Sequence, residues 1–265
     1  MQGNVIDVLF IGDIVGKPGR QAIEDFLPEL KKEYNIDLVI ANIENAAGGF
    51  GCTRSVYHEL LSLGIDFFTS GNHIYDQKEF VEIMDDFDRL IRPLNYPPGN
   101  PGKGYSVIKK NSCSLAVVNL LGRVFTSTVD CPFRAGRSII DTLQKEGYKN
   151  ILIDIHAEAT SEKKAIGYYF EGMVSAVVGT HTHVVTADES ILKGGTAYIT
   201  DVGMTGCIEG ILGFSTEPII ERFLTQRSVR FSPPKKSRNM LQAVLISIDN
   251  STGKAIKITR IDKRD

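Results

Sequence analysis

The chain has 265 residues with a formal net charge of −2, and 42% of the residues are hydrophobic. This length and composition allow a large buried core, and the small net charge argues against a dedicated nucleic-acid binder. No apolar run approaches the roughly 20 residues that span a bilayer, and no secretory leader is recognisable, so we expect a cytoplasmic protein without membrane contact. The scattered cysteines form no Cys-x-x-Cys pair, which argues against a disulfide framework or a structural zinc cluster.

The first half of the chain alternates predicted strands with predicted helices. An apolar run over residues 5–12 predicts a buried strand that leads to Asp13 and a glycine-containing loop. Apolar residues at helical spacing then predict a helix over residues 21–34, which Pro28 should kink or restart. Strands are further predicted over residues 38–43 and 65–70, and helices over residues 55–63, capped by Thr53 or Ser55, and 77–87.

The second half of the chain begins with an irregular connection that contains several prolines and glycines. A hairpin is predicted over residues 105–109 and 114–120, with its turn near residues 110–112. The alternation of strands and helices then returns. Helices are predicted over residues 139–145, 161–170 and 217–225, and strands over 151–155, 174–178, 196–200, 241–248 and 255–261.

Polar side chains follow many of the predicted strands, at the point where each strand ends. In open α/β sheets, ligands collect beyond the carboxyl ends of the strands, so residues that are remote in sequence can converge there. Four of the five histidines belong to this set, whereas His58 lies in a predicted helix and is expected to be structural or solvent-facing. The set consists of Asp13, Glu44, Asn45, Asn72, His73, His156, His181 and His183.

The pair His181 and His183 follows an apolar run and suggests metal chemistry. On an extended backbone, residues i and i+2 point to the same side, so both rings can face a common centre. Neutral imidazole is a frequent metal ligand, but such a pair alone is equally compatible with a surface or packing role. Taken singly, Asp13 or Asn72 could cap a helix, and only the whole set favours a metal site.

Several of these residues stand in short blocks whose order is informative. Gly71-Asn72-His73, the later His156, and Gly179-Thr180-His181-Thr182-His183 follow one another along the chain. The blocks resemble those of the calcineurin-like metallophosphoesterase superfamily. The run Ile43-Glu44-Asn45-Ala46-Ala47-Gly48-Gly49 is similar to the Glu-Asn block of its YmdB-like bacterial branch, and the resemblance covers most of the chain.

Two positions depart from the wider superfamily. Val15 stands where a metal-binding histidine of an Asp-x-His block is usual, so the first metal would lack one imidazole. Asn45 would replace that ligand through its side-chain carbonyl. Glu44 stands where a bridging aspartate is usual, and its longer carboxylate would still span two cations.

The resemblance implies an α/β fold, a four-layer αββα sandwich with two mixed β-sheets, in a single domain over residues 1–265. It also implies two metal ions that share Glu44. One would be bound by Asp13, Glu44, Asn45 and His183, and the other by Glu44, Asn72, His156 and His181. Nitrogen and oxygen donors without a thiolate favour iron or manganese, with zinc as an alternative.

The function implied by the resemblance is dinuclear metal-dependent phosphodiester hydrolysis of cyclic nucleotides, including 2′,3′-cyclic nucleoside monophosphates. A hydroxide that bridges the metals would attack phosphorus, and His73 would act as the general acid. Asp76 would either orient His73 or cap the following helix. The expected partner is a small phosphoester, and a homo-oligomer is compatible with the sequence.

Two other functions are open on the sequence. The same metals could serve a phosphomonoesterase or protein phosphatase, and a metal-dependent regulatory binding protein could keep a vestigial site, although the presence of His73 argues against that. The glycines between residues 48 and 51 allow either backbone contact with a phosphate or a flexible turn. Asp201 and Thr205 either shape the pocket or organise a tight loop.

Overall fold

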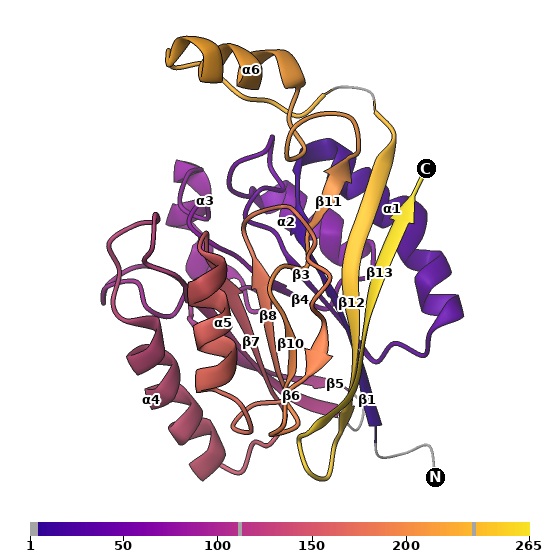
Figure 1. Cartoon of the computed structure of the whole chain (residues 1–265), viewed down its shortest axis with the longest axis vertical. Coiled ribbons are helices and arrows are strands. Elements are labelled where there is room, and N and C mark those ends of the chain that lie inside the picture. The colour runs from indigo at the N-terminus through magenta and orange to yellow at the C-terminus, as the bar shows by residue number, and fades with distance from the viewer. Residues whose placement is uncertain (1–4, 111–112, 235–236) are drawn as a thin grey trace.

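The computed structural model describes residues 5–110, 113–234 and 237–265, which form two β-sheets with helices outside them (Figure 1). One buried apolar cluster contains residues of both sheets, and two further clusters join each sheet to its helices. The predicted four-layer α/β sandwich with two mixed sheets is therefore confirmed. Within the described residues, no helix combines the length and the apolar character needed to cross a membrane.

The first sheet has seven strands and contains a parallel unit in which strands alternate with helices. This unit runs β1 (Val5–Ile11), α1 (Gly16–Glu33), β3 (Leu38–Asn42), α2 (Arg54–Ser62) and β4 (Phe67–Thr69). A short helix, α3 (Lys78–Glu82), and a 3₁₀ turn (Met84–Asp86) follow it. The sheet is completed by β2 (Asp13–Ile14), β11 (Met204–Cys207), β12 (Asn239–Asp249) and β13 (Ala255–Arg264).

The second sheet has six strands and contains a corresponding parallel unit. This unit runs β6 (Cys113–Leu121), α4 (Pro132–Lys145), β7 (Ile151–His156), α5 (Thr160–Tyr169) and β8 (Ala176–Thr180). The sheet also includes β5 (Tyr105–Lys110), β9 (Ser190–Ile191) and β10 (Ala197–Ile199). The last helix, α6 (Thr216–Thr225), lies at the top of the molecule in Figure 1, away from the other helices.

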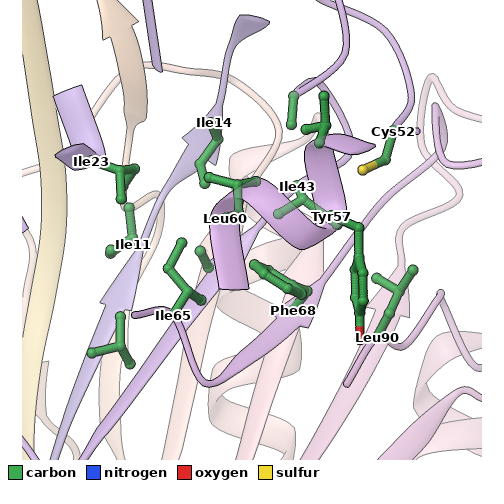
Figure 2. Packing of buried hydrophobic residues seen from close by; sticks show 14 of the residues in the cluster. Ile11, Ile14, Ile23, Ile43, Cys52, Tyr57, Leu60, Ile65, Phe68 and Leu90 are labelled. Carbon is green, nitrogen blue, oxygen red and sulfur yellow. The ribbon is translucent and has the colours of Figure 1, made fainter. Parts of the chain in front are cut away.

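The side chains of strand β1 pack alternately into two different apolar clusters. Successive side chains of a strand point to opposite faces. Val8 and Phe10 accordingly pack into the cluster shared by the two sheets, whereas Leu9 and Ile11 pack into the cluster that contains residues of α1 and α2. Figure 2 shows part of the second cluster, with Ile11 near Ile23 of α1. Each fully buried side chain of this kind stabilises the fold by about 1.5–3 kcal/mol.

The predicted helices differ from the observed ones mainly at their ends. Helix α1 begins at Gly16, so part of the predicted loop is helical, and the helix continues through Pro28 without restarting. Pro28 and Glu24 are both exposed, so the carbonyl that loses its partner four residues before Pro28 faces water. Helix α4 begins seven residues earlier than predicted, at Pro132, which suits the first helical turn.

Three strands of two to four residues were not predicted, because none of them forms an apolar run in the sequence: β2, β9 and β11. The predicted helix over residues 77–87 is divided into α3 and the 3₁₀ turn. Thr53 caps α2 as predicted, since its hydroxyl accepts a hydrogen bond from the backbone N–H of Val56 at 3.3 Å. The hairpin turn was predicted near residues 110–112, and residues 111 and 112 lie outside the described part of the chain.

Candidate metal centre

The predicted site residues lie at the carboxyl ends of strands from both sheets. Each parallel unit brings the ends of its strands to the same edge, and the two edges lie side by side in the stacked sheets. Asp13 follows β1, and His156 is the last residue of β7. The loops after β3, β4 and β8 supply Glu44, Asn45, Asn72, His73, His181 and His183.

Three of these residues converge on Nε2 of a fourth, His156. This atom lies 3.0 Å from Oε1 of Glu44, 3.0 Å from Nδ1 of His181 and 3.2 Å from Oδ1 of Asn72. The ligand atoms of Glu44, His156 and His181 all lie within 4.8 Å of one another, and Glu44 and His156 are buried. Two nitrogen and two oxygen donors at this spacing suit one first-row metal ion.

A second group adjoins the first through Glu44. The side-chain amide of Asn45 donates to Oε1 of Glu44 and contacts Nε2 of His183, each at 3.1 Å. Asp13 is fully buried, and its Oδ2 accepts a hydrogen bond from the backbone N–H of His181 at 3.1 Å. Within the described residues, Oδ1 of Asp13 has no hydrogen-bond partner, which is unfavourable for a buried carboxylate unless a cation lies near it.

Each of the three ligand-type histidines uses one ring nitrogen for an outer partner and directs the other toward the cluster. Metal-binding histidines commonly show this arrangement, because the outer hydrogen bond fixes the tautomer and the orientation of the ring. The outer contacts are His156 Nδ1 with Thr180 Oγ1 at 2.9 Å, His183 Nδ1 with the carbonyl of Leu212 at 3.0 Å, and His181 Nε2 with Glu158 Oε2 at 3.1 Å. The donor set therefore fits a metal centre.

The outer partner of His156 is itself held by a buried carboxyl group. The Thr180 hydroxyl donates to Oδ1 of Asp154 at 2.7 Å, so its oxygen accepts from Nδ1–H of His156. Burial raises the pKa of Asp154 to about 7, although His156 and the hydrogen bond from Thr180 oppose the change. This series of hydrogen bonds leaves Nε2 of His156 facing the other candidate metal ligands.

The charges around His156 favour a cation at the centre. Burial lowers the pKa of His156, but the nearby carboxylates of Glu44 and Asp13 outweigh it and raise the value to about 9. Burial raises the pKa of Glu44, yet His156 outweighs it and the net shift is downward. Burial and the neighbouring His156 lower the pKa of His181 to about 3. The carboxylates thus favour positive charge here, supplied by a proton or a metal ion.

The backbone at His181 and His183 is not the extended strand that the sequence suggested. Strand β8 ends at Thr180, and the φ angles of His181 and His183 are 101° and 62°. Both values lie in a region that residues with a side chain rarely adopt. The prediction of alternation was therefore wrong, and the two rings reach the site from a left-handed turn. Such backbone persists only where the surroundings hold it.

Asp201 holds this turn. Its Oδ2 accepts hydrogen bonds from the backbone N–H of Thr182 at 3.1 Å and from the Thr182 hydroxyl at 2.7 Å, and its Oδ1 accepts from the N–H of Gly203 at 2.8 Å. Nζ of Lys163, in α5, lies 2.6 Å from the same Oδ2, and both side chains are 1% exposed. Of the two predicted roles of Asp201, organising a tight loop is the one that these contacts support.

Sequence reasoning missed Lys163 and Glu158. Lys163 lies in a segment with the pattern of an ordinary amphipathic helix, and Glu158 follows His156 in a polar stretch. Nothing local distinguishes either residue from a solvated charge. Their partners, Asp201 and His181, are 38 and 23 positions away in the chain, so only the tertiary fold reveals the contacts.

His73 lies beside the cluster without joining it. Its backbone N–H donates to Oε2 of Glu44 at 3.0 Å, and its ring Nδ1 lies 2.7 Å from Oδ2 of Asp76. Helix α3 has Gln77 at its N-cap position, and no side-chain capping bond is made there. Asp76 therefore orients His73 and does not cap the helix. His58 is exposed and packs edge-on against Tyr57, as a structural histidine would.

The backbone lies close to the cluster at Gly71. A Cβ atom at this position would lie 2.3 Å from both Oε2 of Glu44 and Nε2 of His156, so only glycine fits there. Gly48, Gly49 and Gly51 all have positive φ angles, which supports their role in a turn. Val15, where the superfamily has a histidine, is buried in an apolar cluster that includes Phe214.

A cavity of about 410 Å³ opens beside the cluster. One side is formed by polar residues of the site. The other is formed by Phe50 and by apolar residues from the segment between β11 and β12, which includes α6. The polar side contains Glu44, Asn45, His73, Glu158, His181, Thr182 and His183. The apolar side contains Phe50, Ile211, Leu212, Phe214, Ile219, Phe223 and Phe231, with Arg222 among them.

The model of the YmdB-like protein family matches residues 9–261. The chain is 51% identical over 255 residues to the 2′,3′-cyclic-nucleotide 2′-phosphodiesterase of Bacillus subtilis (strain 168), covering 96% of each protein. It also resembles the crystal structure of a hypothetical protein from Thermus thermophilus, with a TM-score of 0.91, 40% identity and coverage of 98% of this chain and 100% of that one. A novel phosphatase from Mycoplasma pneumoniae gives a TM-score of 0.92, 35% identity and coverage of 98% and 94%.

Proposed function

The chain belongs to the YmdB-like protein family, and on that premise we propose that it is a dinuclear metal-dependent phosphodiesterase that hydrolyses 2′,3′-cyclic nucleoside monophosphates. The observation that carries this proposal is the convergence of Glu44, Asn72 and His181 within 3.2 Å of Nε2 of His156, at the wall of a cavity that also contains His73. The 51% identity to a 2′,3′-cyclic-nucleotide 2′-phosphodiesterase supports the choice of substrate.

In this proposal, the carboxylate of Glu44 would contribute to both metal positions. For Asn45 to act as a ligand, its carboxamide turns so that the oxygen, not the nitrogen, faces the cation. Iron or manganese suits the donors, and zinc is an alternative. When bound, the metals supply an activated water and neutralise charge on the phosphoryl oxygens. The proposed sets are Asp13, Glu44, Asn45 and His183 for one metal, and Glu44, Asn72, His156 and His181 for the other.

The remaining steps belong to residues of the chain. A water molecule that has released one proton to solvent forms a bond from its oxygen to phosphorus, and the bond between phosphorus and O2′ of the ribose breaks, which leaves a 3′-monophosphate. O2′ needs a proton as it leaves, and His73 supplies it as the general acid. Because Nδ1 of His73 is engaged by Asp76, Nε2 is the nitrogen available for this transfer. The backbone bond from His73 to Glu44 fixes the acid relative to the metal site.

The test compares substrates and one pair of variants. The purified protein should be assayed for bound metal and then for hydrolysis of 2′,3′-cyclic, 3′,5′-cyclic and monoester substrates. His73→Ala should keep its metal and lose about 10²- to 10⁴-fold in kcat, whereas His58→Ala, at an exposed histidine outside the cluster, should match the wild type. Unchanged turnover in metal-loaded His73→Ala would remove the acid assignment. A preference for monoesters would favour a phosphatase. Binding of a substrate without any turnover would favour a regulatory binding protein.

A further inference from the structure

The apolar side of the cavity contains a row of aromatic rings that starts at the proposed general acid. The ring of Phe50 meets His73 edge-on, with 5.0 Å between centroids, and stacks on Phe214 at 5.4 Å with an interplanar angle of 28°. Phe231 follows at 6.2 Å from Phe214. At the outer end, the guanidinium of Arg222 lies 5.8 Å from the centre of the Phe231 ring. The row therefore extends from the proposed general acid, His73, to α6.

The proposed role of His73 indicates where the base of a bound nucleotide would lie. The ribose oxygen that receives the proton must lie against His73, so the base carried by the same ribose extends away from the metals. The aromatic row is the wall next to that position. Resting on the proposed function, we propose that the aromatic side of this cavity is the nucleobase subsite, in which the base stacks on the phenylalanine rings and α6 covers it.

The free protein leaves surface available for such a ligand. Phe223 of α6 lines the cavity, yet 75% of its surface is exposed, so a bound base would bury apolar area that now faces water. Within the described residues, the side chain of Arg222 makes no hydrogen bond or ion pair, and its donors remain available at the outer end. Aromatic rings stack on any base, and a guanidinium adds hydrogen bonds to acceptors on the edge of the base.

The size of the cavity agrees with this occupant. Small-molecule sites typically enclose about 300–1,000 Å³ and combine apolar walls with a few placed polar groups. The 410 Å³ here has that character, with the polar groups at the phosphoester end and the aromatic groups at the base end. A mononucleotide has the same division, because its phosphate is charged and its base is flat and largely apolar on its faces.

The test compares two neighbouring residues of α6 and two substrates. Phe223 lines the cavity, whereas Leu224, 80% exposed, does not belong to its lining and is the matched control. Phe223→Ala should raise KM for 2′,3′-cyclic AMP by about fivefold to a hundredfold, the usual effect of losing one stacking ring. It should change KM for ribose 2,3-cyclic phosphate, which has no base, by less than about twofold, and Leu224→Ala should change neither.

Equal effects of Phe223→Ala on both substrates, or no effect on either, would overturn the subsite. Binding of adenosine 3′-monophosphate and of ribose 3-phosphate to the metal-loaded protein separates this inference from the proposed function, because it needs no turnover. If Phe223→Ala weakens the binding of adenosine 3′-monophosphate but not that of ribose 3-phosphate, the subsite is supported even if the cyclic diester is not hydrolysed. Hydrolysis of the cyclic diester with equal Kd for nucleotide in the wild type and the variant keeps the proposed function and rejects the subsite.

Discussion

Nζ of Lys163 lies 2.6 Å from Oδ2 of Asp201, and both side chains are almost completely buried. Removing one partner of a buried ion pair leaves the other charge uncompensated and costs about 3–5 kcal/mol. Lys163→Met should therefore lower the free energy of unfolding by about this amount, which denaturant titration measures. Because Asp201 also holds the turn at Thr182, between His181 and His183, the variant should bind less metal.

Lys164→Met is the matched control for Lys163→Met. Lys164 is the next residue of the same helix and pairs with Asp188 at 3.1 Å, but its side chain is 46% exposed. Exposed ion pairs contribute about 0–1 kcal/mol, so this variant should stay within that range and keep its metal. Equal losses in the two variants would indicate that Lys163 has no particular role in holding the site.

Glu158→Gln should weaken metal binding without removing a proposed ligand. Oε2 of Glu158 lies 3.1 Å from Nε2 of His181 and orients that ring. Mutation of an outer partner of this kind typically lowers metal affinity by about 10- to 100-fold. We expect the lower figure because the amide oxygen of Gln can still accept a hydrogen bond and because the Glu158 side chain is 49% exposed. Titration of the metal-free protein with manganese measures the change. Glu146→Gln, at an exposed position after α4, should leave the affinity unaltered.

Asp188→Asn should change stability in a way that depends on pH. Burial raises the pKa of Asp188, but hydrogen bonds from Thr200 and Thr186 outweigh it and lower the value to about 2. The folded-state pKa is thus below the ordinary value of 3.8, so the carboxylate stabilises the fold above about pH 4 and this contribution is lost as the pH falls toward 2. Unfolding free energies should differ between wild type and Asp188→Asn at pH 6 and converge near pH 2. A difference that is constant with pH would contradict the assignment.

Arg222→Gln should alter base selectivity if α6 covers the nucleobase. The guanidinium stands at the outer end of the aromatic row, above Phe231, and guanine presents two acceptors on one edge, where adenine presents one acceptor and one donor. The wild type should therefore have a higher kcat/KM for 2′,3′-cyclic GMP than for 2′,3′-cyclic AMP, and Arg222→Gln should reduce the ratio. Arg227→Gln is the control, because Arg227 pairs with Glu221 and does not line the cavity.

The order of strands and the residues that end them could be predicted because those signals are local. A short apolar run followed by Asp13, Glu44 or His156 needs no knowledge of the tertiary structure. The common edge of parallel strands then predicts convergence. The αββα architecture followed from the family resemblance, and the structure confirms it.

What could not be predicted depends on contacts between distant segments. The left-handed backbone at His181 and His183 is maintained from Asp201, 20 and 18 positions later, and no residue type in the turn announces it. The aromatic side of the cavity could not be predicted for a similar reason. Phe50, Phe214 and Phe231 come from separate loops, and each alone has the sequence signature of an ordinary core residue.

The donors around His156 come from different halves of the molecule. Glu44 and Asn72 follow strands of the seven-stranded sheet, whereas His156 and His181 come from the six-stranded one. A cation held by all four would act as a clasp between the two sheets, and unfolding would have to release it. Folding and metal binding would then be linked by mass action. In a cell with little free metal, the folded fraction of this protein would fall as the free metal concentration falls.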